Sequence, residues 1–432
     1  MLETLKNAFK IKEIRNKILF TFAMLVVIRL GSQLPVPGVD RHYFSNWFAQ
    51  QTGDAFNFFD AFTGGSFLNM SILALNITPY ITSSIIMQLL TIAIPKLEEM
   101  QRDGEEGRKK MVSITRYVTV GLALFESTAM AIAFGGNGLL ENYNALNVIT
   151  VIAALTAGSA FLMWVGERIT ENGVGNGISI VLVINIISRI PQDLASLFQQ
   201  FVIGKPIATA VCAAALILAI IIGMVVLVII LNDGVRKIPV QYAKRIVGNK
   251  QYGGVRQYIP LKMNAANVMP IIFAQALMFI PMLFANVAPG FAAAFSDMRG
   301  FWYNLTLGIL VVAFTYFYTA IIINPQMMAD DMKRNGGFIP GVKPGKATVN
   351  YIDTIMTRIT LPGSIFLALV AILPALAMKF LNIQQAFAYF YGGTSLLIMV
   401  GVILDTLKQI ESYLLMRHYD GLMKTGRIQG RY

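Results

Sequence analysis

Long apolar runs, separated by short polar segments, occupy most of the chain. A helix needs about 20 mostly apolar residues to cross the hydrocarbon core of a bilayer, and ten runs approach that length. They lie near residues 18–34, 71–94, 112–134, 148–165, 178–190, 207–231, 266–288, 303–323, 359–380 and 393–407. The pattern predicts an all-α integral membrane protein with ten transmembrane helices, of which the fifth and the tenth are short.

Composition supports this interpretation. Of 432 residues, 56% are hydrophobic and 13% are charged, whereas soluble domains carry roughly 25% charged residues. The apolar run Ile18–Ile28 is followed by Arg29 and Pro35 rather than by a small-residue cleavage site, so we expect an uncleaved first span rather than a signal peptide. The single cysteine, Cys212, excludes a disulfide or a thiolate metal site within the chain.

The distribution of positive charge predicts the topology. With the N-terminus inside, 29 of the 35 lysines and arginines fall on the inner side. The positive-inside rule then places both termini in the cytoplasm. The net charge of +12 is therefore read as a cytoplasmic surface rather than as a nucleic-acid-binding domain.

Similar landmarks recur in two sets of five spans. The second span carries Asn76–Pro79 and the seventh carries Asn267–Pro270, while glycine-rich stretches, Gly173–Ser179 and Gly392–Ser395, precede the fifth and the tenth. Five is an odd number, so a repeat of five helices must be inverted in the membrane. Because Gly and Pro are common in spanning helices, coincidence is the alternative.

The resulting halves are residues 1–190 and residues 191–432. The second half contains two basic segments, about 232–262 and 325–358, which are longer than simple connectors. The positive-inside rule explains their charge but not their length, so we expect an acidic or RNA-containing partner to dock there.

The stretch 56–94 is the most unusual part of the pattern. Residues 56–67 form an aromatic and glycine-containing piece too short to span, and Pro79 interrupts the apolar run that follows. Ile77 and Ile81 share one helix face, as do Leu182 and Ile186 in the fifth span. An aliphatic seal is one interpretation, but spacing alone favours ordinary helix packing.

Few ionisable groups lie inside the predicted spans. Arg29 and Glu126 are the clear cases, and we favour a structural role for both. A secondary transporter would need a polar or charged site near the bilayer midplane, and an intramembrane hydrolase would need a nucleophile with a base or paired acids. Neither constellation is apparent, and no phosphate-binding GxxxxGK[ST] loop is present.

Several segments in order along the chain resemble the SecY family of protein-conducting channels. They are IRNKILFTFAMLVVIRLGSQLPVPG, ITPYITSSIIMQLL, EEGRKK, ENGVGNGISI, RKIPVQYAKR, FIPGVKPGKATVNYIDTIMTRITLPGSIFLA and GGTSLLI. The resemblance implies ten helices in two inverted halves around an hourglass pore, with a short re-entrant plug helix. Where the family pattern is PG-x-RPG, this chain has Lys343, which keeps the charge but lacks the bidentate guanidinium.

The resemblance also implies roles for particular residues. The pore ring corresponds to Ile77, Ile81, Leu182, Ile186, Ile272 and Ile398. The plug corresponds to about 56–67, including Phe56, Phe58, Phe59, Phe62, Gly64 and Gly65. Thr82 and Ile280 correspond to the lateral gate, and Arg236, Lys237, Lys244, Arg245 and Lys343 to a docking surface for the SecA motor or the ribosome.

The implied function is a channel that translocates unfolded secretory polypeptides across the bacterial cytoplasmic membrane and releases membrane segments sideways. It is not an enzyme and needs no cofactor or metal. The implied partners are SecE and SecG-like small membrane subunits, SecA, the translating ribosome, signal peptides with nascent chains, and phospholipid. An accessory SecY paralogue for a restricted substrate set and, less favoured, a secondary transporter are the alternatives.

Overall fold

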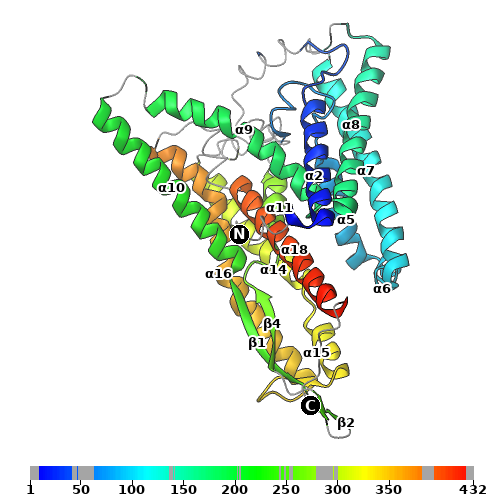
Figure 1. Cartoon of the computed structure of the whole chain (residues 1–432). Coiled ribbons are helices and arrows are strands. Elements are labelled where there is room, and N and C mark those ends of the chain that lie inside the picture. The colour runs from blue at the N-terminus through cyan, green and yellow to red at the C-terminus, as the bar shows by residue number, and fades with distance from the viewer. Residues whose placement is uncertain are drawn as a thin grey trace. The chain divides into compact units, whose positions relative to one another are not determined.

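A computed structural model of the chain describes residues 9–40, 46, 63–135, 140, 142–201, 203, 206–242, 245–247, 250–252, 256–278, 295, 300–381 and 394–424. The described chain is mostly helical, as Figure 1 shows. The helices are α2 (Lys12–Gly31), α5 (Thr78–Ala93), α6 (Pro95–Arg102), α7 (Gly104–Phe134), α8 (Ala145–Asn172), α9 (Gly177–Phe201), α10 (Ile207–Asp233), α11 (Met269–Met278), α14 (Phe301–Ile322), α15 (Pro325–Arg334), α16 (Lys346–Leu381) and α18 (Thr394–Lys424).

Each predicted apolar run overlaps a described helix, but the helices differ in their capacity to span. Within the described residues, four helical stretches are long and apolar enough to cross a membrane. They are Ala145–Asn172, Ala214–Asp233, Phe301–Arg334 and Lys346–Lys379. The pair α5 and α6, bent by 109° at Ile94, makes a fifth if it is counted as one span. The chain is therefore a membrane protein with several apolar helices.

The helix boundaries differ from the apolar runs in a regular way. α7, α8, α16 and α18 all extend into charged sequence, because helix formation does not stop where the apolar run does. In contrast, α5 begins only at Thr78, and the preceding residues from Ile72 form turns. Proline is tolerated in the first turn of a helix, where its missing N–H has no partner in any case. Pro79 therefore marks the start of α5.

The structure comprises two compact units, Met1–Gln192 with Val402–Tyr432, and Asp193–Gly401. In the first unit, α7 packs against both α5 and α8, and α2 packs against α8. Hydroxyl pairs join these helices: Ser83 contacts Thr119 at 2.5 Å in a buried pair, and Ser127 contacts Thr156 at 3.0 Å in a partly buried one. Such hydroxyl contacts suit helix association in lipid, where apolar burial adds little drive.

In the second unit, α14 packs against α11 and α16, and a small sheet accompanies α15. The strands are β1 (Val235–Tyr242), β2 (Arg245–Val247), β3 (Lys250–Tyr252), β4 (Arg256–Lys262) and β5 (Gly337–Phe338). β1 pairs antiparallel with β4 along seven residues and with β5 at Gln241 and Tyr242. Figure 1 shows β1 and β4 side by side. The expectation of an all-helical chain does not hold for this stretch.

The sheet joins the two basic segments into one substructure. Its hydrophobic core, here called the hairpin core, takes residues from both segments: Ile238, Val240, Leu261, Met332, Ile339, Ile352 and Met356. The segment predicted as a loop at 325–358 contains α15, β5 and the start of α16. Asn324 caps α15, since its side-chain oxygen accepts from the N–H groups of Gln326 and Met327.

Candidate functional site

Three of the predicted pore-ring residues share one hydrophobic cluster of the first unit. Ile77 is fully buried in it, and Ile81 and Leu182 pack against it. We call this set the aliphatic cluster: Ile28, Leu73, Ile77, Leu162, Val165, Ile169, Ile180 and Val181, with Ile81 and Leu182 among those packed around them. Ile186, a fourth predicted ring residue, is also fully buried. The predicted ring residues at the start of α5 and on α9 therefore lie on the interior side of this unit.

A turn segment, residues 71–77, places Ile77 in the aliphatic cluster. Asn76 occupies the left-handed region with φ +53°, which asparagine tolerates better than most side chains. Its buried side chain accepts a hydrogen bond from the amide of Asn185 on α9, with Nδ2 to Oδ1 at 3.0 Å. Ser159 on α8 donates to the Asn76 carbonyl at 3.2 Å. We call Asn76, Asn185 and Ser159 the amide node.

Backbone hydrogen bonds to the chain after α2 fix the turn segment further. The N–H of Ile72 donates to the carbonyl of Leu34, and the N–H of Val36 donates to the carbonyl of Met70, both at 3.0 Å. Gly158 on α8 lies so close to the segment that an added Cβ would meet the Ile72 carbonyl oxygen at 2.0 Å. Irregular backbone with unpaired polar groups is costly at membrane depth. Here the N–H of Ile72 and the carbonyl of Asn76 pair with other elements, and the N–H groups of Ala74 and Asn76 donate to carbonyls within the segment.

The start of α9 is anchored on the same unit. Asn176 accepts from the N–H of Ile178 at 3.1 Å, as an N-cap does. Thr170 accepts from the N–H of Gly177, and Thr21 on α2 accepts from the N–H of Val174. The glycine-rich stretch before the fifth span therefore serves as a tightly bonded helix start.

The plug prediction lies mostly outside the described residues. This applies to Phe56, Phe58, Phe59 and Phe62. Gly64 and Gly65 are described, and both have positive φ, +65° and +84°. A Cβ on Gly64 would lie 2.7 Å from the carbonyl oxygen of Asn185, so this glycine permits close contact with α9.

The remaining predicted ring and gate residues are not members of the aliphatic cluster. In the second unit, Ile272 is half-buried on α11 and Ile398 is buried on α18. Thr82 is half-buried on α5, and its hydroxyl donates to the carbonyl of Thr78. Ile280 lies outside the described residues.

The predicted docking residues lie around the hairpin core. Arg236 and Lys237 are exposed on β1, and Lys343 is exposed in the turn before α16. Thr348 is buried, and its hydroxyl donates to the Lys343 carbonyl at 3.0 Å. Lys244 lies outside the described residues, and for Arg245, the first residue of β2, the structure describes the backbone only.

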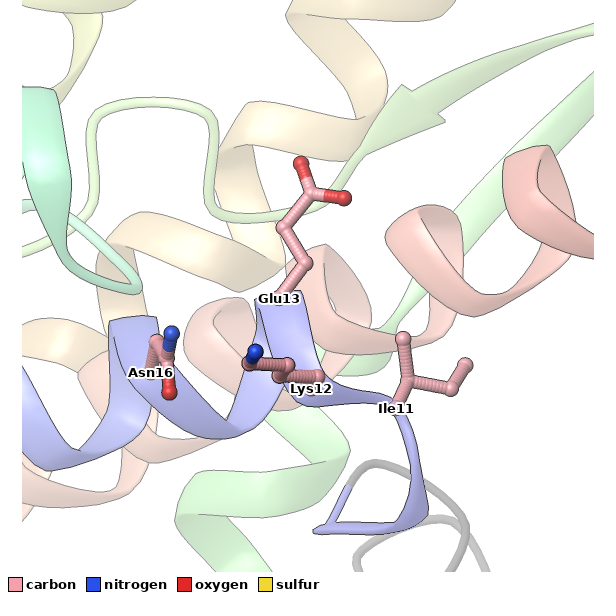
Figure 2. Close-up of a pocket in the computed structure, with 4 residues that line it drawn as sticks. All are labelled: Ile11, Lys12, Glu13 and Asn16. Carbon is pink, nitrogen blue, oxygen red and sulfur yellow. The ribbon is translucent and has the colours of Figure 1, made fainter.

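Other candidate chemistry is sparse in the described part of the chain. It holds no group of three or more His, Cys, Asp or Glu side chains placed to bind a metal ion. Figure 2 shows a pocket at the start of α2, lined by Ile11, Lys12, Glu13 and Asn16. None of these four is a predicted site residue. The amide node, by contrast, was missed by sequence reasoning, which flagged Asn76 only as part of a repeat.

Comparison with known proteins identifies relatives along nearly the whole chain. A family model described as SecY matches residues 71–407. The chain is 43% identical to the protein translocase subunit SecY of Halalkalibacterium halodurans, over 98% of this chain and 100% of the relative. It is 38% identical to the protein translocase subunit SecY of Mycobacterium tuberculosis, with the same coverage.

Solved structures show the same fold at lower sequence identity. The chain resembles the one titled "The structure of a protein conducting channel" with a TM-score of 0.59 and 19% identity, over 92% of each chain. It also resembles "Sec61 in the Canine ribosome-channel complex from the endoplasmic reticulum" with a TM-score of 0.57 and 17% identity, again over 92% of each.

Proposed function

The chain belongs to the SecY family, and from this premise we propose that it is the channel subunit of a protein translocase. It conducts unfolded polypeptides across a membrane and releases apolar segments sideways into the lipid. The observation that carries this function is the 43% identity over 98% of the chain to a protein translocase subunit SecY. As a channel subunit it is not an enzyme, so the energy for transport comes from a partner or from the membrane potential.

The direct test is reconstitution of the protein with its small membrane subunits in liposomes. An unfolded precursor should become protected from added protease only when a SecA-type motor and ATP are present. An accessory paralogue would protect a restricted set of precursors in the same assay. Protection of no precursor at all, together with partner-independent uptake of a small solute, would contradict the channel and favour a secondary transporter.

We further propose ten spans in two inverted halves, about residues 1–190 and 191–432. The turn–helix junctions of α5 and α11 support a repeat. Asn76 and Asn267 have φ values of +53° and +52°, and in both cases the helix begins two residues later. The N–H of Ile81 donates to the carbonyl of Ile77, as the N–H of Ile272 does to that of Val268.

A second pair of positions supports the same repeat. Gly158 of α8 and Gly363 of α16 are each followed by serine. A Cβ on Gly158 would meet the Ile72 carbonyl oxygen, and one on Gly363 would meet that of Met263 at 2.6 Å. Ile72 and Met263 precede their junction asparagines by four residues each. The same small-residue contact therefore recurs at the same place in both halves.

The pore ring in this proposal consists of Ile77, Ile81, Leu182, Ile186, Ile272 and Ile398. The aliphatic cluster supports the contribution of the first half, because it brings residues from the start of α5 and from α9 into one buried apolar cluster. Flexible aliphatic side chains can exclude hydrated ions yet yield to a polypeptide, since dispersion contacts between them are individually weak.

The ring assignment can be tested by measuring how well the resting channel excludes ions. Replacing Ile77 or Ile398 with Asn should raise the ion conductance of the resting channel in planar bilayers, because a polar side chain holds water in the constriction. Leu305, an exposed residue of α14, offers a control: Leu305→Asn should leave the conductance unchanged. Equal conductance in all three variants would contradict the ring assignment.

We also assign residues 56–67 to the plug, with Gly64 and Gly65 at its end, and Thr82 with Ile280 to the lateral gate. The tight approach of Gly64 to α9 supports a plug that is seated on the first half. For the lateral gate, Thr82 is half-buried on α5. Signal peptides and nascent membrane segments are the substrates expected to pass it.

The docking surface in this proposal lies on the hairpin core. Its exposed cations, Arg236, Lys237 and Lys343, are held on a sheet and a turn rather than on separate loops. Lys244 and Arg245 belong to the same basic segment. A positive patch of this kind suits the acidic surface of a SecA-type motor or ribosomal RNA. SecE and SecG-like subunits complete the proposed assembly.

Charge reversal tests this surface. Changing Arg236, Lys237, Lys244 and Arg245 to Glu should weaken motor or ribosome binding in a flotation assay, because like charges then face each other. The protein should remain inserted, since the hairpin core is unchanged. Undiminished binding of both partners would contradict the docking assignment. The proposed location is the bacterial cytoplasmic membrane, with both termini in the cytoplasm.

A further inference from the structure

The amide node joins residues that lie far apart in the sequence. Asn185 donates its side-chain amide to Asn76 across a separation of 109 residues, at 3.0 Å. Asn76 is 2% exposed and Asn185 is 3% exposed. A buried hydrogen bond of this kind is costly to break, because its partners are then left without water.

The two asparagines each precede a predicted ring residue. Asn76 is followed by Ile77, and Asn185 is followed by Ile186; both isoleucines are fully buried. The hydrogen bond therefore fixes the start of α5 to the middle of α9 directly beside the ring positions. Ser159 adds α8 to this connection through the Asn76 carbonyl.

The end of the predicted plug also contacts Asn185. Gly64 lies against the backbone of Asn185, where an added Cβ would be 2.7 Å from the carbonyl oxygen and 2.9 Å from the hydroxyl oxygen of Ser188. One residue of α9 thus contacts the plug end through its backbone and the start of α5 through its side chain.

The residue types fit this arrangement. Asn76 combines a left-handed backbone with an acceptor in the side chain, which glycine and aliphatic residues cannot do. A turn in apolar surroundings needs its polar groups paired, and Asn185 supplies a donor without charge.

We propose that Asn76 and Asn185 are positioning residues of the closed channel: their amide bond holds the turn that carries Ile77 against the part of α9 that carries Ile186, where Gly64 at the plug end also packs. Opening must then separate this pair or move it as one piece. This inference rests on the proposed function and adds a gating role to residues outside the ring itself.

The test uses the whole channel complex in planar bilayers, with resting conductance as the measurement. Asn185→Leu removes the donor, and Asn76→Gly removes the acceptor while keeping the left-handed backbone accessible. Each should raise the resting open probability by about tenfold, which corresponds to about 1.4 kcal/mol. The double variant should leak no more than the stronger single variant, because both changes remove the same bond.

Ser83→Ala is the matched control. It removes another buried hydrogen-bonding contact of α5, the one with Thr119 on α7. We expect it to lower the thermal midpoint of the purified complex without raising the resting conductance. A leak in Ser83→Ala equal to that of Asn76→Gly would overturn the positioning role, since any loosening of α5 would then suffice.

Failure of this inference is distinguishable from failure of the proposed function. If the wild-type complex translocates a precursor and Asn76→Gly shows wild-type resting conductance, the positioning role is wrong and the channel stands. If the wild-type complex translocates nothing, the proposed function fails and the inference fails with it. The resting conductance of Asn76→Gly tests the positioning role even if Asn185→Leu does not fold.

Discussion

The two turn–helix junctions, residues 71–81 and residues 262–272, have nearly the same backbone and different surroundings. Asn76 and Asn267 share the left-handed conformation, and a proline follows each three residues later. Asn76 is buried and hydrogen-bonded to α9, whereas Asn267 is exposed. The left-handed turn is therefore a property of the backbone at both junctions, while the buried amide bond belongs to one.

A second asparagine pair near the junction of α11 sharpens this contrast. Asn264 donates to Asn232 of α10 at 3.4 Å, which is long for a hydrogen bond. The side-chain oxygen of Asn264 is buried and has no hydrogen-bond partner among the described residues. The asparagine pair of the first junction is thus joined by a hydrogen bond of ordinary length, and that of the second by a long one. We conclude that the first junction is the more rigidly held.

The largest effect should come from removing the first asparagine. Asn76→Leu puts a side chain that disfavours positive φ at this turn and leaves the amide of Asn185 unpaired, so it should lower the free energy of unfolding by about 2–5 kcal/mol. Asn267→Leu should cost only the backbone term, about 1–2 kcal/mol. Denaturant unfolding of the purified complex in detergent measures both.

Glycine at the same two positions separates the backbone cost from the cost of the lost hydrogen bond. Asn76→Gly relieves the backbone term and keeps the loss of the hydrogen bond, while Asn267→Gly should be close to neutral. Equal losses for Asn76→Leu and Asn267→Leu would show that the buried bond contributes nothing and that the contrast between the junctions is wrong.

A smaller effect is expected at the glycines that face the two junctions. A Cβ at Gly158 would lie 2.0 Å from a backbone oxygen, and one at Gly363 would lie 2.6 Å from the equivalent oxygen. Overpacking of this kind costs about 1–3 kcal/mol, so both alanine variants should unfold at lower denaturant concentration, Gly158→Ala more than Gly363→Ala. Gly223, which has open space around it, provides the control.

The two Asn-x-x-Pro motifs were predicted as landmarks of a repeat, but neither the helix starts at these junctions nor their contacts were predicted. Both motifs were placed inside apolar runs, 71–94 and 266–288, whereas α5 and α11 begin at Thr78 and Met269, with the proline in the first helical turn. The Gly-Ser pairs of α8 and α16 were also visible and would have strengthened the repeat. The partnership of Asn76 with Asn185 was not predictable, since nothing in either local sequence specifies a contact across 109 residues.

The sheet was missed for a different reason. Ile238 and Val240 alternate with exposed residues of β1, which is a strand signal. However, Pro239 and Pro260 lie in β1 and β4, and proline within a run argues against a strand. The pairing of β5 with β1, which joins the two basic segments, depends on residues almost 100 positions apart and could not be inferred from either segment.

The smallest change in unfolding free energy should come from the weak Asn264–Asn232 pair. A substitution there tests the comparison at the second junction. Asn264 is buried and its side-chain oxygen has no hydrogen-bond partner among the described residues, and leucine is of similar size. Asn232 is half-exposed and keeps access to solvent. Replacing a poorly satisfied buried polar group with an apolar one is often close to neutral. We therefore expect a change in unfolding free energy below about 1 kcal/mol, against a clear loss for Asn185→Leu in the same measurement. A loss for Asn264→Leu as large as that for Asn185→Leu would mean that both junctions depend equally on their amide pairs, and that the first junction is not the more strongly held.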